Sequence, residues 1–435
     1  MAALQCDVEV DRDLAQGGQH SAKDISRQAR HLRIGLFGMF GGGNYGNDGS
    51  LETMVQLLRE LRPTAELFCV CVDPDGIAEQ YRILTIPLSA PAFTHTFLKL
   101  CDKISMRALS RSANWMRAIL QVRNLDLIIV PGTSTLCDYR SGPLGTPYGL
   151  FRWAAAARLC GVKFCFVGTG AGPIWHDISR WMLKSVAAWA YYRSFRDQVS
   201  KDFVTSLGID TTKDPVHPDL VFRMPTPEPR SGASPPNRPL TIGIGVMNYN
   251  GWRPRSDSAI HDSYMTKMSG FVSSLLHQGY RIRLLTGETA DRQAVEHLAK
   301  LARSEGYQVT DHASTMAEPG QVIKEPTSDL HDLMNQMLDT DVVIATRFHN
   351  VICSLKVSRP TISIGYEAKN EAVMADFGMS HFSQHIDELD RDWLDARFTE
   401  LVEQKNFWEG TIRQRLQVIQ LRMEEFEEGL EAAIL

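Results

Sequence analysis

The sequence predicts an α/β protein made of two domains, each built on a doubly wound parallel sheet. Short apolar runs rich in β-branched residues alternate with amphipathic helical stretches, which is typical of parallel strands covered by helices. A segment with six prolines, residues 224–239, divides this alternation into two series. A chain of 435 residues with 43% hydrophobic content is long enough for two cores. We therefore expect a ligand cleft between the carboxyl edges of two sheets.

Changes in composition divide the chain into five segments. Residues 1–30 are polar and charged, and we expect a disordered N-terminal extension. The other segments are an N-terminal α/β domain, a proline-rich linker, a C-terminal α/β domain and a helical tail, at 31–223, 224–239, 240–385 and 386–435. Apolar residues in the tail are spaced by threes and fours, so they require a partner surface. We prefer packing across both domains to a coiled-coil dimer.

Charge and cysteine usage limit the class of protein. The net charge of −5 gives no global positive field, so nucleic acid is not an expected partner. The eight cysteines show no C-x-x-C spacing and are expected to be reduced core residues of a cytosolic protein. The first thirty residues lack the apolar core of a secretory signal. We expect a cytoplasmic protein, with peripheral contact to the inner face of the membrane as an open alternative.

A glycine-rich turn follows the first predicted strand, residues 31–37, and precedes an amphipathic helix. Because ligands gather at the carboxyl ends of parallel strands, we favour a substrate-facing loop. A turn needed only for close packing of the helix is the second interpretation. The turn also matches the dinucleotide fingerprint G-x-G-x-x-G at residues 41–46. However, the next strand ends at Asp73, about 27 positions past Gly46, instead of the expected ~20.

A basic amphipathic helix is predicted over residues 99–123. Its cations recur at every fourth position beside an apolar stripe: Lys99, Lys103, Arg107 and Arg111. Such a helix can rest on an anionic membrane or on the phosphates of an acceptor. The alternative, which we favour, is an ordinary solvated helix face.

The stretch whose side chains are the best candidates for catalysis is Thr346-Arg-Phe-His349. The five residues before it form an apolar run that predicts a buried strand, and a helix is predicted to follow it up to Pro360. Arg347 and His349 would then stand between the carboxyl end of a strand and the amino end of a helix, where N–H groups and the helix dipole attract anions. The alternative is a capped helix with an ordinary surface arginine.

Three further candidates follow predicted strands. Arg196 is predicted to hold an anion while Asp197 orients its guanidinium, or else to form a local ion pair of little value. His176 is a candidate for the same sheet edge, although a lone histidine is more often structural. The aromatic loop at residues 247–253 is a candidate for stacking on a sugar ring, with a structural loop as the alternative.

Three separated motifs resemble those of the polysaccharide pyruvyl transferase family. The matching residues are Gly-x-Asn-x-Gly-Asn-x-Gly at 42–49, Arg196-Asp197 with a downstream Pro218-Asp219, and Arg347-Phe-His349 followed by Tyr366-Glu-Ala-Lys369. The likeness covers roughly residues 33–380. The turn at Pro131-Gly-Thr-Ser134 differs from the run of glycines that is usual there. The resemblance implies two Rossmann-like domains of the GT-B type, with an active-site cleft between them.

The resemblance also implies transfer of the pyruvyl group of phosphoenolpyruvate to two hydroxyls of a sugar, which gives a cyclic ketal and free phosphate. His349 would be the general acid that protonates the enol methylene, and Arg347 would hold an anionic group of the donor with Arg196 and Lys369. The chemistry requires no metal and no cofactor. The acceptor is expected to be a sugar of a polysaccharide or of its lipid-linked precursor. The remaining predicted substrate-binding residues are Gly43, Asn44, Gly46, Asn47 and His176.

Two other classes remain open at this point. A GT-B glycosyltransferase that uses a nucleotide sugar would hold the diphosphate with Arg347 and the ribose with Glu367 or Glu371. A binding protein that keeps the fold without turnover is the other alternative.

Overall fold

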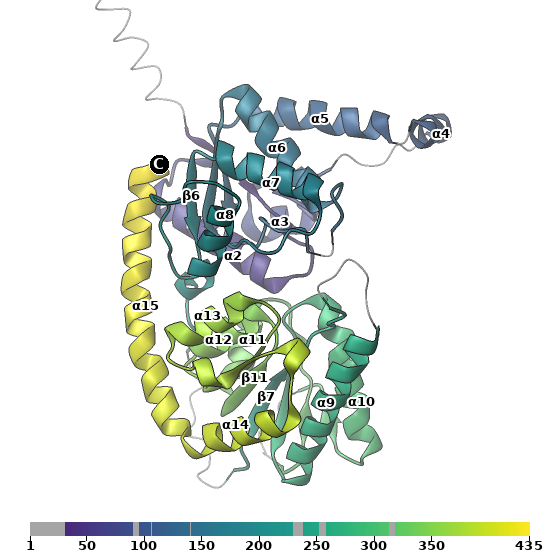
Figure 1. Cartoon of the computed structure of the whole chain (residues 1–435), viewed down its shortest axis with the longest axis vertical. Helices are drawn as coiled ribbons and strands as arrows, with labels where there is room; N and C mark the ends of the chain where they lie inside the picture. The colour runs from purple at the N-terminus through teal and green to yellow at the C-terminus, as the bar shows by residue number, and fades with distance from the viewer. Residues whose placement is uncertain are drawn as a thin grey trace, which may run out of the picture.

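The computed structural model describes residues 31–89, 95–105, 107–139, 141–228, 238–251, 258–312 and 318–435. They form two α/β domains, and a long C-terminal helix runs along the side of both (Figure 1). The predicted disordered extension and the greater part of the predicted linker lie outside the described residues.

The N-terminal sheet contains six described strands, all parallel, in the order β3-β2-β1-β4-β5-β6. The strands are β1 (Arg33–Phe37), β2 (Glu66–Cys71), β3 (Leu84–Pro87), β4 (Leu127–Pro131), β5 (Lys163–Thr169) and β6 (Tyr192–Phe195). The helices are α2 (Tyr45–Leu61), α3 (Pro74–Tyr81), α4 (Thr96–Ile104), α5 (Ala108–Val122), α6 (Thr146–Cys160), α7 (Asp177–Trp189), α8 (Gln198–Ser206) and the 3-10 helix η1 (Leu220–Arg223). The strand order reverses between β1 and β4, where diverging loops leave room for a ligand.

The C-terminal sheet repeats this topology with seven described parallel strands in the order β13-β12-β11-β7-β8-β10-β9. The strands are β7 (Thr241–Gly245), β8 (Arg281–Leu285), β9 (Val309–Thr310), β10 (Val322–Ile323), β11 (Val342–Ala345), β12 (Thr361–Gly365) and β13 (Ser383–His385). The helices are α9 (Ser258–His277), α10 (Arg292–Ser304), α11 (Leu330–Leu338), α12 (Phe348–Lys356), α13 (Ala368–Asp376), α14 (Arg391–Glu403) and α15 (Lys405–Ile434), with 3-10 turns η2 (Thr289–Asp291), η3 (Ser380–Phe382) and η4 (Ile386–Glu388). The switch point here lies between β7 and β11.

The central strands explain why the fold class is readable from sequence. Every residue of β4 and of β11 is buried, because helices cover both faces of each parallel sheet. Such strands appear as continuous apolar runs, and the predicted α/β class with two parallel sheets is confirmed. The edge strands β9 and β13, and β10 beside β9, have only two or three residues each, too few to produce a recognisable pattern.

The continuous basic helix predicted over residues 99–123 is wrong. The chain forms two helices, α4 and α5, which are separated at Arg107, where the backbone is left-handed with φ of 64°. The carboxylate of Asp102 accepts hydrogen bonds from the backbone N–H and the hydroxyl of Ser110, which stabilises the first turn of α5. As a result α4 turns away at the far end of α5 and projects from the N-terminal domain (Figure 1).

Helix α15 joins the cores of the two domains, which is the first of the two arrangements predicted for the tail (Figure 1). Its first half packs into the core of the C-terminal domain through Trp408, Ile412 and Ile419. Its second half packs against the N-terminal sheet through Met423, Phe426, Leu430 and Ile434. Although α15 has 30 residues, no described helix combines the length and the apolar composition that crossing a bilayer requires.

Replacing Phe426 by alanine tests the role of α15. Phe426 is fully buried, so Phe426→Ala should leave a cavity and lower the free energy of unfolding by about 3–5 kcal/mol in urea titration. The matched control on the same helix is Phe407→Ala, because Phe407 is 62% exposed and should change stability little. Equal losses for the two variants would contradict the packing described.

Candidate active site

Loops at the carboxyl ends of both sheets enclose a cavity of about 280 Å³ between the domains. The N-terminal domain supplies the glycine loop after β1, the turn after β4 and the residue after β6. The C-terminal domain supplies the turns after β8, β11 and β12. The polar lining residues that matter below are Asn44, Asn47, Thr133, Ser134, Thr135, Arg196, Glu288, Arg347, His349, Glu367 and Lys369.

Arg347 is the N-cap residue of α12, and His349 lies in the first turn of that helix. The turn is held by Thr346, whose hydroxyl lies 2.8 Å from the hydroxyl of Tyr264. Strand β11 ends at Ala345, so both functional side chains leave the backbone where the sheet edge meets a helix N-terminus. This is the local structure that the sequence predicts.

The guanidinium of Arg347 is already paired with carboxylates where it lines the cavity. Its guanidinium forms two hydrogen bonds with Asp291, at 2.8 and 2.7 Å, and an ion pair with Glu288 at 2.6 Å. Burial alone would lower the pKa of Arg347, but the adjacent carboxylate of Asp291 outweighs it and raises the pKa above its usual value. Asp291 is fully buried, whereas Glu288 stands on the cavity wall.

The other two cations are compensated in the same way. Arg196 donates to Asp219 at 3.1 Å and lies over the ring of Phe348, with its guanidinium carbon 4.5 Å from the ring centroid. Lys369 donates to Glu367, which also lines the cavity. Three cations thus converge on one cavity, and each has a carboxylate partner.

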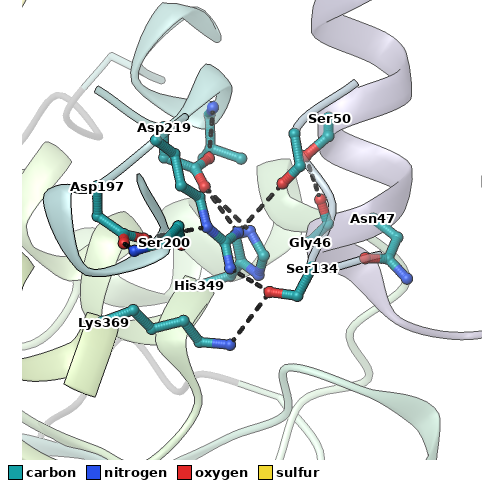
Figure 2. Close-up of polar contacts among 12 residues, drawn as sticks. Gly46, Asn47, Ser50, Ser134, Asp197, Ser200, Asp219, His349 and Lys369 are labelled. Atoms are coloured by element: carbon teal, nitrogen blue, oxygen red, sulfur yellow. Dashed lines mark hydrogen bonds and ion pairs between the residues drawn. The ribbon is translucent and has the colours of Figure 1, made fainter. Parts of the chain in front are cut away.

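His349 lines the same cavity, and its imidazole lies near the carboxylate of Asp219 (Figure 2). Its Nε2 atom is buried, is 3.9 Å from the Asp219 carboxylate and makes no hydrogen bond within the described residues. Burial lowers the pKa of His349 to about 4; the nearby Asp219 opposes this shift, and the cations Arg196 and Lys369 add to it. The imidazole is therefore neutral at pH 7 in the free protein.

The glycine loop brings the N-terminal domain against this histidine. A Cβ atom added to Gly46 would lie 1.8 Å from Nδ1 of His349, so only glycine leaves room for the imidazole. Gly43 adopts φ of +85°, and its carbonyl accepts a hydrogen bond from the backbone N–H of Thr289 in the other domain at 2.8 Å. The loop therefore both lines the cavity and packs closely against the other domain, while its contact with a substrate stays a prediction.

The structure brings together all but one of the predicted site residues. Asn47 lines the cavity, and Asn44 caps α2 and donates to Glu288 across the domain boundary at 3.1 Å. His176 does not line the cavity; it is the N-cap residue of α7, and its backbone N–H donates to Asp138 at 3.0 Å. Its prediction as a site residue is therefore not supported.

The described part of the predicted sugar-stacking loop, residues 247–251, does not line the cavity. Tyr249 is fully buried, and its hydroxyl donates to Asp387 at 3.0 Å, which makes it a core residue. Trp252 and Arg253 lie outside the described residues. Glu367 lines the cavity and Glu371 does not.

Sequence reasoning missed the hydroxyls of the turn after β4 and the acids of the turn after β8. Thr133 and Thr135 line the cavity with buried hydroxyls that make no hydrogen bond within the described residues, while Ser134 accepts one from Arg196. Glu288 and Asp291 are the partners of Arg347. The available signal was polar residues directly after a buried strand, which in a parallel sheet marks the ligand edge.

Two Rossmann-like domains with a cleft between their carboxyl edges define the GT-B type of fold. HepE from Anabaena, solved in complex with UDP, has a TM-score of 0.56 and 10% identity, with 93% of this chain and 99% of that chain covered. A glycosyltransferase from Rickettsia africae has a TM-score of 0.54 and 12% identity, with 92% and 98% covered. At these identities the likeness establishes the fold alone.

The family model described as polysaccharide pyruvyl transferase matches residues 44–368. This range begins at Asn44, the last residue of the glycine loop; it includes Gly46, Arg196, Arg347 and His349, and it is the greater part of the chain. The chain belongs to the polysaccharide pyruvyl transferase family.

The contact between Gly46 and His349 can be tested by adding one methyl group. The family resemblance implies that His349 is a general acid, so Gly46→Ala, which should displace the imidazole, is expected to lower turnover by at least about 100-fold. The measurement is phosphate release by the purified variant. Gly410→Ala is the control, because a Cβ there meets no atom within 4 Å. A folded Gly46→Ala protein with normal turnover would contradict the assigned role of this contact.

Proposed function

We propose that the protein transfers the pyruvyl group of phosphoenolpyruvate to a saccharide acceptor as a cyclic ketal and releases inorganic phosphate. The observation that carries the proposal is His349, a buried histidine with an unpartnered Nε2 in an interdomain cavity beside Arg196, Arg347 and Lys369. Membership of the family supplies the reaction class. The donor is a small molecule with two anionic groups, which suits a cavity of this size and cation content.

The carboxylates on the cavity wall mark where the donor's anionic groups would bind. Arg347 keeps its two hydrogen bonds to the inaccessible Asp291, and its remaining ion pair is with Glu288. Lys369 likewise pairs with Glu367. Phosphate and carboxylate of the donor replace Glu288 and Glu367 as partners of these cations, so the protein binds the donor by exchanging one anion for another.

The unpartnered polar atoms support a ligand at the same place. Buried hydroxyls and ring nitrogens almost always have hydrogen-bond partners, so atoms without one point to a missing polar group. Thr133 Oγ1, Thr135 Oγ1 and His349 Nε2 are three such atoms on one cavity wall.

His349 acts as the general acid that protonates C3 of the enol. In the free protein, burial and the adjacent cations keep the imidazole neutral. A donor that carries three negative charges offsets those cations and raises the pKa of His349, so donor binding itself prepares the proton donor. The resulting oxocarbenium-like centre at C2 is then open to attack by a sugar hydroxyl.

The remaining steps balance without a further reactant. The first sugar hydroxyl adds to C2 and returns its proton to His349, and the second hydroxyl then displaces phosphate from the same carbon. The enol methylene becomes a methyl group, the two hydroxyl oxygens become the ketal oxygens, and phosphate leaves with one proton. Asp219, 3.9 Å from the imidazole, stabilises the protonated His349 that begins the sequence.

The test is inorganic phosphate release from phosphoenolpyruvate across a panel of sugar acceptors. Release should depend on acceptor and fall by at least about 100-fold in His349→Ala, since a general acid typically contributes 10²- to 10⁴-fold. His277→Ala is the matched control, because His277 is exposed on α9 and remote in the fold from the cavity lining.

Two results would overturn the proposal. Normal turnover by a folded His349→Ala protein would remove His349 as the acid. Absence of release across the panel, together with a thermal shift caused by nucleoside diphosphates and none by phosphoenolpyruvate, would favour the nucleotide-sugar glycosyltransferase instead.

A further inference from the structure

A second cavity, of about 600 Å³, lies beside the catalytic cavity and shares part of its wall. The residues that line both cavities are Met39, Thr135, Tyr139 and Thr146. The rest of the wall includes residues of α5, α6 and the segment after β3. Among the described lining residues none is a carboxylate, whereas three are arginines: Arg107, Arg111 and Arg152.

Arg152 is a buried cation without a carboxylate partner among the described residues. It is only 4% exposed; its Nη2 donates to the carbonyl of Leu88 at 2.6 Å, and its guanidinium lies 5.8 Å from the ring centroid of Tyr148. Its Nε makes no hydrogen bond within the described chain. Because burying an uncompensated charge is costly, an anion that enters the cavity would be stabilised beside Arg152.

The two cavities therefore differ in charge. In the catalytic cavity every cation has a carboxylate partner, and two of these carboxylates stand on the wall. In the second cavity Arg107 and Arg111 join Arg152. The described acid on their own segment, Asp102, lies outside the wall; it is bonded to Ser110 and is also attracted to Arg107 and Arg111, which leaves three cations against one carboxylate. The second cavity has an excess of positive charge that the first lacks.

We propose that this second cavity binds a phosphate or diphosphate group carried by the saccharide acceptor. His349 lines the first cavity and not the second, so an anion held by these arginines is separated from the proton donor by the shared wall. That separation fits a phosphate on the acceptor and does not fit the phosphate of the donor, which must lie beside the reacting carbon. The identity of the anion as part of an acceptor rests on the proposed pyruvyl transfer.

Binding of inorganic pyrophosphate, measured by titration calorimetry with phosphoenolpyruvate at saturation, tests this site. Arg107→Gln/Arg111→Gln should weaken pyrophosphate binding by roughly tenfold or more, because each variant position loses charge-assisted hydrogen bonds. The matched control is Arg117→Gln/Arg123→Gln, which removes the same charge from the same segment at positions that do not line the cavity. The control should bind pyrophosphate as the wild type does.

The outcomes separate this proposal from the proposed function. If both double variants bound pyrophosphate equally weakly, the effect would come from the overall charge of the protein, and the proposed site would be wrong. Displacement of pyrophosphate by phosphoenolpyruvate would assign the cavity to the donor and also overturn it. Selective loss in Arg107→Gln/Arg111→Gln supports the anion site even if no acceptor yields phosphate release, in which case the proposed function alone fails.

Helix α4, which directly precedes Arg107 in the chain, presents a second feature. Leu100 and Ile104 are one turn apart and are 54% and 73% exposed. Apolar side chains that lie one turn apart on a helix usually form a face that is covered by another element. Lys99 and Lys103 are exposed beside them. Residues 95–123 contain six Lys or Arg and one Asp, in a chain whose net charge is −5.

We infer that α4 docks on an anionic lipid bilayer, with its two apolar side chains inserted at the surface. The excess of cations complements an anionic leaflet, and the exposed apolar pair gives the additional burial that surface helices require. α4 projects from the N-terminal domain, so it can reach a surface without collision with the rest of the protein (Figure 1). Membrane contact at α4 would present a lipid-linked acceptor to the adjacent arginines.

Sedimentation with vesicles of phosphatidylcholine and phosphatidylglycerol tests the docking. Leu100→Ser/Ile104→Ser should lower the partition coefficient by roughly tenfold or more, because two buried aliphatic side chains are lost. The matched control is Val418→Ser/Leu421→Ser, an exposed apolar pair on α15. Wild type that never sediments, or self-association of the protein through α4 in ultracentrifugation, would overturn the inference.

Discussion

The contact between Gly46 of the N-terminal domain and His349 of the C-terminal domain links the chemistry of the site to the spacing of the two domains. The imidazole occupies the position where any other residue would place its Cβ atom. This approach is held by backbone and side-chain hydrogen bonds across the boundary, from Thr289 to Gly43 and from Asn44 to Glu288. The imidazole that we propose as the general acid is thus fixed by a surface that belongs to the other half of the protein.

Two buried ion pairs, Arg347–Asp291 and Arg196–Asp219, lie beside the same boundary. Buried pairs contribute little net stability because desolvation offsets the attraction between the charges. Their value here is positional: Asp291 orients Arg347, and Asp219 orients Arg196, from sites that solvent hardly reaches. Glu288 and Glu367 differ because they stand on the cavity wall, where a ligand can replace them.

The fold was readable from the sequence because its central strands are buried on both faces. Runs such as β4 and β11 are apolar at every position, and the proline-rich segment separates the two series. Arg347 and His349 could be located for the same reason, since they directly follow β11. Local pattern was sufficient wherever a residue's role depended on its own strand and helix.

Roles that depend on distant segments could not be read in this way. The pairing of Arg347 with Glu288 and Asp291 joins residues about 56 positions apart, and no local pattern encodes it. The break at Arg107 depends on the contact between Asp102 and Ser110, whereas the four-residue spacing of cations fits one continuous helix equally well. His176 follows a strand as the other candidates do, yet the chain turns it into the cap of α7.

Helix α15 sets the order in which the two domains can complete their hydrophobic cores. The side chains of Met423, Phe426, Leu430 and Ile434 fill the core beneath the N-terminal sheet, although they are among the last residues of the chain. During synthesis the N-terminal strands are made first, but the apolar surface that α15 covers stays open until residues 423–434 have also been made. The N-terminal domain therefore begins to fold first but completes its core last. Until then, the apolar surface that α15 will cover is the part of the nascent chain that most needs protection from aggregation.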